Sequence, residues 1–255
     1  MTAPEGLVPE PLAEHVPPEA GRPRHAMLLS GVGRYADPWH PFAETSAALA
    51  GLLREAGYDV DIPADVDAAL ETLVLGEETD LPDLLVVNVG LPRDELPSPG
   101  TPDAAAGLAR WLDSARPLLA SHVSSTSFLE LPEWEAGVGG RWVRGQSMHP
   151  EYGPAAIHIL PGSGPLVAGI PDFKLLDERY SWLRTAPGIK VHATHTHDGV
   201  HHPVMWSFER SAERRTPGRG PAGRTFYDAL GHDAASYESA EHRELLHRAL
   251  AWLTD

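Results

Sequence analysis

Histidine is the residue type in this sequence with the widest chemical use, because imidazole transfers protons near neutral pH and binds borderline metals. The chain has 255 residues and contains 14 histidines. Three of them, His40, His122 and His232, each follow a predicted strand, directly or after a short loop. Ligands of open parallel α/β sheets bind beyond the carboxyl ends of the strands, so we expect these three imidazoles to share one edge of a sheet.

A second group of histidines is dense in the sequence itself, at His195, His197, His201 and His202. Alternate residues of a strand share a face, so His195 and His197 could chelate a metal ion. An Asp-Gly turn signal follows them, which indicates that some of these side chains are exposed instead. Both interpretations stay open.

Residue content argues against several other chemistries. The sequence has no cysteine, which excludes disulfides, thiolate catalysis and cysteine-bound zinc. Serines flank His122, but a serine nucleophile also needs a base and an oxyanion hole, and no G-x-S-x-G pattern is present. Gly31 and Gly33 lack the third glycine of a dinucleotide fingerprint, so we expect no nucleotide cofactor.

The charge of the chain argues against two classes of partner. It carries 20 basic and 36 acidic side chains, which give a formal net charge of -16. Such a surface repels nucleic-acid phosphates and anionic membrane leaflets. No segment approaches the length of a membrane span, and the N-terminus lacks the pattern of a secretion signal. We therefore expect a cytoplasmic protein that binds neither nucleic acid nor membrane.

Strand-like and helix-like segments alternate through the first half of the chain. Thr101 and Pro102 mark the start of one helix, and Gly57 marks the end of another. The expected strands cover 25–31, 58–62, 84–90 and 116–123, and the expected helices cover 41–56, 65–75 and 101–115. This alternation predicts an α/β fold with a parallel sheet between helices on both faces, which is a three-layer arrangement.

The second half of the chain is less regular. Strand-like runs occur at 155–160, 189–195, 203–208 and 224–230, and a final helix is expected over about 238–253. Residues 1–24 are rich in proline and predict a flexible N-terminal arm, either free or lying on a neighbouring copy, so a homo-oligomer is left open. Residues 25–255 form one expected domain. The stretch 209–223 is rich in Arg, Gly and Pro and predicts a long loop near the expected cleft.

Five stretches, in order along the chain, carry a family resemblance. They are His40–Ser46, Leu119–Phe128, Gly139–Val143 followed by His149-Pro150, Leu176–Tyr180, and Pro203–Trp206 with Gly223–Asp233. Together they resemble the ThuA-like (trehalose utilisation) family, which belongs to the class I glutamine amidotransferase-like superfamily of flavodoxin-like folds. The resemblance covers roughly residues 25 to 255.

The resemblance implies positions for the chemistry. His122 lies at the turn where glutamine amidotransferases carry a cysteine nucleophile. The sequence has no cysteine, which excludes thiolate glutaminase chemistry. His232 resembles the triad histidine of that fold, and Gly231 lets the backbone turn toward the cleft. His149 and Glu178 are brought to the same cleft by the resemblance alone. We expect His232, Glu178, His149 and His122 to be catalytic.

A small-molecule carbohydrate is the expected substrate. His40 and Asp233 are expected to contact it, although Asp233 could instead cap the following turn. Tyr180 and Trp206, with Trp182, could form an aromatic wall for a sugar ring. The family name suggests a 3-keto-glycoside, whose acidic α-proton a base such as His232 could remove while Glu178 or His149 assists the leaving oxygen.

Two alternatives remain beside this acid–base enzyme. The first is a metal-dependent hydrolase in which a divalent ion such as zinc or manganese is held by His149, Glu178 and His232 or by the dense histidine group. The second is a non-catalytic descendant of the amidotransferase fold that binds a ligand or a partner.

Overall fold

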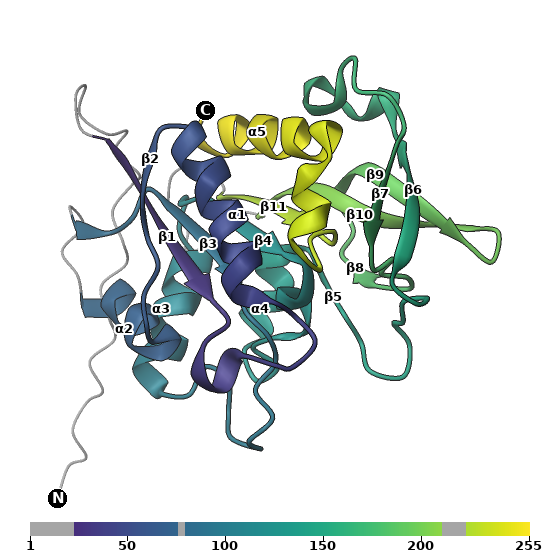
Figure 1. The fold of residues 1–255 in the computed structure, drawn as a ribbon. Helices are drawn as coiled ribbons and strands as arrows, with labels where there is room; N and C mark the ends of the chain where they lie inside the picture. The colour runs from purple at the N-terminus through teal and green to yellow at the C-terminus, as the bar shows by residue number, and fades with distance from the viewer. Residues whose placement is uncertain (1–22, 76–79, 211–222) are drawn as a thin grey trace, which may run out of the picture.

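Five parallel strands form the first half of the central sheet, which lies between two layers of helices (Figure 1). Their apolar runs are buried on both faces, as in the completely buried β3 sequence LLVVN. The order is β2-β1-β3-β4-β11, which begins as the flavodoxin-like order does. The strands are β1 (Arg24–Ser30), β2 (Tyr58–Asp61), β3 (Leu84–Asn88), β4 (Leu118–Ser121) and β11 (Arg224–Asp228).

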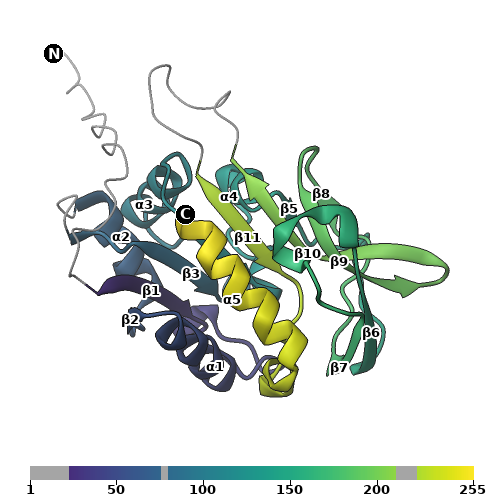
Figure 2. The same ribbon diagram turned by 90° about the horizontal axis from the view of Figure 1, so that it is seen from above.

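Helices cover both faces of this sheet, so the predicted three-layer α/β fold is confirmed. Figure 2 shows α1 (Phe42–Glu55) and α5 (Ala240–Thr254) on one face. The other face carries α2 (Val66–Leu75), α3 (Pro102–Leu112) and α4 (Pro132–Val138). The short helix α4 was not predicted. The structure describes residues 23–75, 80–210 and 223–255, and it is a computed structural model.

The predicted helix ends are confirmed by their caps. The Thr101 hydroxyl accepts a hydrogen bond from Ala104 N at 3.1 Å, and Pro102 is the first residue of α3. Gly57 follows α1 with a φ of +87°, a conformation that glycine adopts without steric cost. These local signals position the helices without help from the rest of the chain.

The other half of the sheet, which comes from the less regular second half of the sequence, is antiparallel, so the sheet as a whole is mixed. Its strands are β10 (Val200–Glu209), β9 (Lys190–His197), β6 (Gly153–Ile159) and β7 (Phe173–Asp177), and β5 (Gly140–Arg141) pairs separately with β8 (Arg184–Thr185). The Asp198-Gly199 turn makes a tight hairpin of β9 and β10, so they must run antiparallel. Strand β7 was not predicted, and it ends beside the turn that follows β11.

The expected Pro-rich arm and most of the 209–223 loop lie outside the described residues. The two ends of that loop are paired, with Arg210 N donating to Gly223 O at 2.8 Å. They lie where β11 begins, whereas His232 follows the end of β11, so the loop leaves the sheet at the edge opposite to the expected cleft. Among the described residues, no helix is both long enough and apolar enough to span a membrane.

A buried ion pair fixes α5 beneath the turn that carries His232. His242 and Asp228 are 0% and 1% exposed, and their Nε2 and Oδ2 atoms lie 2.7 Å apart. The second ring nitrogen, Nδ1, lies 2.9 Å from the carbonyl oxygen of Ser236. Both partners accept, so both nitrogens carry protons and the ring is an imidazolium. Burial opposes this charge, but Asp228 outweighs it and raises the pKa of His242.

Replacing His242 by glutamine should destabilise the fold by about 3–5 kcal/mol at pH 6, because it leaves the Asp228 carboxylate buried without its counter-charge. The folded-state pKa of His242 lies above its ordinary value of 6.5, so its stabilisation is complete below that value. It is lost as the pH rises through the raised folded-state pKa. Urea unfolding at pH 6 and pH 9 should therefore show a smaller gap between variant and wild type at the higher pH.

The matched control is His247→Gln on the same helix, where the imidazole is 31% exposed and pairs with Glu55 at 3.0 Å. This exposed pair should contribute at most about 1 kcal/mol. Two results would contradict the buried charge pair. One is an equal loss of unfolding free energy in the two variants, and the other is a difference between His242→Gln and wild type that does not change with pH.

Candidate functional site

Four side chains from distant parts of the chain converge at one edge of the sheet. They are His40, His122, Glu178 and His232, and one nitrogen or carboxylate oxygen from each lies within 4.8 Å of all the others. We call this group the His/Glu cluster. It is the one group of this kind among the residues that the structure describes.

Topology explains why three of these residues meet. His40 lies in the loop after β1, His122 directly follows β4, and His232 lies in the turn after β11. The carboxyl ends of these parallel strands lie at the same edge, which confirms the expected position of the three imidazoles. Glu178 follows β7 and reaches the edge from the antiparallel half of the sheet.

His40 is oriented by a carboxylate three residues earlier. Its Nδ1 lies 2.8 Å from Asp37 Oδ2, and Asp37 Oδ1 also accepts from the backbone amides of Trp39 and His40. Burial would raise the pKa of Asp37, but the bond to His40 lowers it overall. Nδ1 therefore carries the proton and Nε2 is left with a lone pair.

His122 is oriented by a backbone carbonyl. Its Nδ1 lies 2.7 Å from Ala229 O, so this nitrogen donates and Nε2 is the one that faces the cluster. The residue has a φ of 41°, which is strained for a side chain other than glycine. The hydroxyl of Tyr227 donates to His122 O at 2.8 Å and holds the strained turn.

Glu178 and His232 are positioned by the same buried carboxylate. Asp177 accepts hydrogen bonds from the amides of Glu178 (2.8 Å), His232 (3.2 Å) and Gly231 (2.7 Å). The predicted turn at Gly231 is present, with a φ of +100°. A side chain at this position would also collide with the Tyr237 hydroxyl.

The electrostatics of the cluster centre on Glu178. Burial opposes ionisation of its carboxyl, but the adjacent His122 and His232 hold its pKa well below the usual range. Burial likewise disfavours a charged His232, yet Glu178 outweighs it and raises the pKa of His232. Burial lowers the pKa of His40, which favours its neutral form.

Three ring nitrogens of the cluster are buried without a hydrogen-bond partner: His40 Nε2, His122 Nε2 and His232 Nδ1. Glu178 Oε2 lies 3.4 Å from the His122 nitrogen and 3.3 Å from the His232 nitrogen. Ligand atoms at the edges of a tetrahedral zinc site are about 3.3–3.5 Å apart, given metal–ligand bonds of about 2.0–2.1 Å. The donor set and these two distances therefore suit a divalent metal.

His149 lies beside the cluster but outside the group of four. Its Nε2 is 3.6 Å from Glu178 Oε1 and its side chain is 36% exposed, so it faces the solvent side. Its Nδ1 lies 2.9 Å from Pro150 O, which leaves the lone pair on Nε2. Tyr152, which sequence reasoning missed, packs its ring 5.3 Å from that of His232, and burial together with the neighbouring Asp233 raises the pKa of its hydroxyl.

The predicted aromatic wall is not built as expected. Trp206 is completely buried, and its indole N–H donates to Val138 O at 2.9 Å, so it is a core residue. Tyr180 stacks on His122 at 4.3 Å but is only 2% exposed, so it lies behind the cluster. Asp233 accepts from Ala235 N at 2.9 Å and caps the 3₁₀ helix η7 (Ala234–Glu238), the structural alternative that the sequence left open.

The dense histidine group does not form a cluster of three ligands within the described residues. His195 is buried, and its Nε2 lies 3.0 Å from Tyr180 O. His202 accepts from Trp182 N at 3.2 Å through its Nδ1. These two imidazoles therefore form hydrogen bonds with the backbone of Tyr180 and Trp182 and hold that segment in place.

Sequence reasoning also missed the residues that orient the cluster. Asp37 had a readable signal, since an aspartate three residues before a histidine can bond both its backbone and its ring. Asp177 had no such signal, because its partners come from residues 231–236, which are more than 50 positions away.

Replacing Gly231 by alanine should disturb the cluster, because it adds both an unfavourable φ and a collision with Tyr237. Gly199→Ala is the matched control: its φ is +74° and a Cβ there meets nothing within 4 Å. The control should cost about 1–2 kcal/mol in urea unfolding. Gly231→Ala should cost more, and equal costs would show that the Tyr237 contact does not constrain the turn.

Comparison with known proteins gives the family. The sequence matches the family model ThuA, described as trehalose utilisation, over residues 36–253. No curated protein sequence matches it.

Two solved structures share the fold. A putative ThuA-like protein from Parabacteroides merdae has a TM-score of 0.68 and 16% identity, covering 91% of this chain and 90% of that chain. One from Bacteroides uniformis has a TM-score of 0.67 and 14% identity, covering 94% and 95%. The family match extends over most of the chain, so the protein belongs to the ThuA family and has a carbohydrate-related role.

Proposed function

We propose that this protein is a divalent-metal-dependent enzyme that performs acid–base chemistry on a carbohydrate. One observation carries the proposal: three unpartnered imidazole nitrogens and an ionised carboxylate converge in the His/Glu cluster. Two acceptors facing each other, such as the lone pair of His122 and the Glu178 carboxylate, repel unless a cation or an extra proton lies between them. A bound cation satisfies all four groups at once.

The surroundings of the cluster support a metal site. Metal-binding histidines commonly donate their other N–H to a carboxylate or a carbonyl. His40 donates to Asp37 in this way, and His122 donates to Ala229 O. Three imidazoles with one carboxylate suit zinc or manganese. Such an ion supplies a Lewis acid that polarises a carbonyl or hydroxyl oxygen of the substrate.

His149 is then the acid–base group. The four cluster residues would hold the ion, whereas His149 lies outside this group of four, with its Nε2 3.6 Å from Glu178 Oε1 and its side chain 36% exposed. On a 3-keto-glycoside, this nitrogen takes the proton from the carbon next to the carbonyl. The C–H electron pair forms a C=C bond, the glycosidic C–O bond breaks, and the departing oxygen takes up a proton. The family description, trehalose utilisation, supports a glycoside of this kind.

A metal-free acid–base pair is the second candidate. The raised pKa of His232 and the ionised Glu178 support it, because one group could donate a proton and the other accept one. In that mechanism His232 acts directly on the substrate, as a general acid.

The purified protein should bind one zinc or manganese ion per chain, measured by elemental analysis and isothermal titration after chelator treatment. Glu178→Gln and His122→Ala should abolish tight binding, because each removes a ligand. Asp37→Asn should weaken binding by about 10–100-fold, because it removes the carboxylate that orients His40. His158→Ala is the control, since this imidazole is 42% exposed and pairs only with Asp172. Binding that survives loss of Glu178 and His122 would contradict the metal site.

Turnover of 3-keto-trehalose, followed by NMR, tests the reaction. His149→Gln should lower kcat by about 10²–10⁴-fold, because it removes a general base, while metal content stays unchanged. Chelation should abolish turnover, and added metal should restore it.

Other results separate the candidates. Turnover that survives chelation but not His232→Ala would favour the metal-free pair. A wild-type protein that binds metal yet converts no keto-glycoside would contradict the proposed substrate. The proposal of a metal-dependent enzyme would then have to be tested on another sugar. A protein that binds sugar with neither metal nor turnover would be a binding protein.

A further inference from the structure

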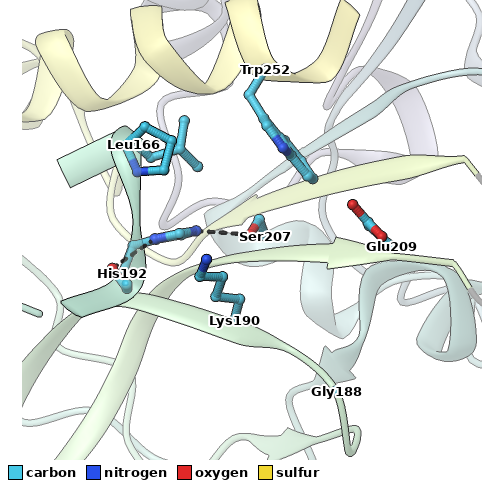
Figure 3. Close-up of a pocket in the computed structure, with 9 residues that line it drawn as sticks. Leu166, Gly188, Lys190, His192, Ser207, Glu209 and Trp252 are labelled. Carbon is cyan, nitrogen blue, oxygen red and sulfur yellow. Dashed lines mark hydrogen bonds between the residues drawn. The ribbon is translucent and has the colours of Figure 1, made fainter. Parts of the chain in front are cut away.

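A cavity lies on the α5 face of the sheet, between β9, β10 and α5 (Figure 3). Its volume is about 320 Å³. Its floor comes from alternate residues of β9 and β10, and its roof comes from α5 and from the 3₁₀ helices η4 (Pro161–Ser163) and η5 (Pro165–Val167). We call it the α5 pocket.

The α5 pocket and the cluster belong to opposite edges of the sheet. Glu209 lines the pocket. In the register of the two strands it lies opposite Arg224, the first residue of β11. The cluster lies beyond Asp228, the last residue of the same strand. Four steps along a strand span about 13 Å, so a small ligand in the pocket cannot contact the cluster directly.

The centre of the pocket floor is polar and uncharged. His192 is buried between two serines, with Nδ1 3.0 Å from Ser163 Oγ and Nε2 2.8 Å from Ser207 Oγ. Burial, with a smaller effect from Lys190, lowers the pKa of His192 to about 4, so the ring is neutral. A neutral ring donates to one serine and accepts from the other, which leaves one hydroxyl proton and free oxygen lone pairs for a ligand.

Two opposite charges line the same cavity without pairing. Lys190 and Glu209 both contribute to the lining, and neither forms an ion pair with another side chain of the described residues. Both side chains are exposed. The pocket therefore presents a strong donor and a strong acceptor at separate positions.

The opposite wall is apolar. Trp252 extends from α5 toward the strands, and Leu166 of η5 lines the same side of the cavity (Figure 3). The guanidinium of Arg224 lies 5.1 Å from the Trp252 ring centre and keeps the indole in place. A ligand in the pocket would contact an aromatic surface on one side and hydrogen-bonding groups on the other.

We infer that the α5 pocket binds a neutral polyhydroxylated molecule of monosaccharide size, as a second ligand site of this protein. Each hydroxyl of such a ligand both donates and accepts, so it satisfies Lys190 and Glu209 together. Its C–H face suits the indole of Trp252. An anion is attracted to Lys190 but repelled by Glu209, and a cation meets the reverse, so a ligand that carries a single charge gains less. Neither the metal nor the reaction proposed for the cluster enters this inference.

The test is an NMR titration that observes the indole N–H of Trp252, assigned by comparison with Trp252→Phe. Metal-free protein is titrated with the neutral probes D-glucose, D-galactose and myo-inositol, and with the charged probes D-gluconate and D-glucosamine. We expect at least one neutral probe to shift the Trp252 signal saturably, and both charged probes to bind about tenfold more weakly or not at all.

Matched variants locate the binding. Lys190→Met and Glu209→Gln should each weaken binding of the neutral probe by about tenfold, because each removes a charge-assisted hydrogen bond. The controls Lys174→Met and Glu133→Gln change the same charges elsewhere on the surface and should leave binding unchanged, as should His232→Ala in the cluster. The inference is overturned if no neutral probe shifts the Trp252 signal, if a charged probe binds more tightly, or if the pocket variants bind as wild type does.

Discussion

One buried carboxylate joins the two halves of this fold and determines the geometry of its site. Asp177 is completely buried, and its oxygens accept three backbone amides and the Ser236 hydroxyl. Burial raises its pKa, so these four donors are what make the carboxylate tolerable in the interior. Because the amides belong to Glu178 on one side and to Gly231 and His232 on the other, the same contact that closes the fold also sets the Glu178–His232 distance.

Charge in the interior is balanced locally around this contact. Ser236 links Asp177 to His242, which in turn neutralises Asp228 at the end of β11. The turn after β11 is therefore held from α5 and from β7 at once. A turn fixed on both sides can keep the His232 imidazole close to Glu178 and His122, where a free loop would let these side chains move apart.

The two candidate sites differ in the ligand that their polar groups require. In the His/Glu cluster, three imidazoles and a carboxylate can all act as ligands once the rings have lost their extra protons, so the partner that we propose there is a cation. In the α5 pocket, Lys190 is a donor and Glu209 is a separate acceptor, and serine hydroxyls line the floor between them. The ligand that we propose there is therefore an uncharged molecule that both donates and accepts. A ThuA-family protein with both would handle sugars at two edges of one sheet.

The sequence by itself determined the parallel half of the fold and the edge at which His40, His122 and His232 meet. Apolar runs, the Thr101 cap and Gly57 are local signals, and parallel topology then places residues that follow strands together. It did not determine β7 or the burial of Trp206 and Tyr180, which could equally have lined a cleft. Only the tertiary structure decided these, because they depend on contacts between segments far apart in the chain. Asp177 and Gly231 meet across 54 positions, and no periodicity or spacing records such a pair.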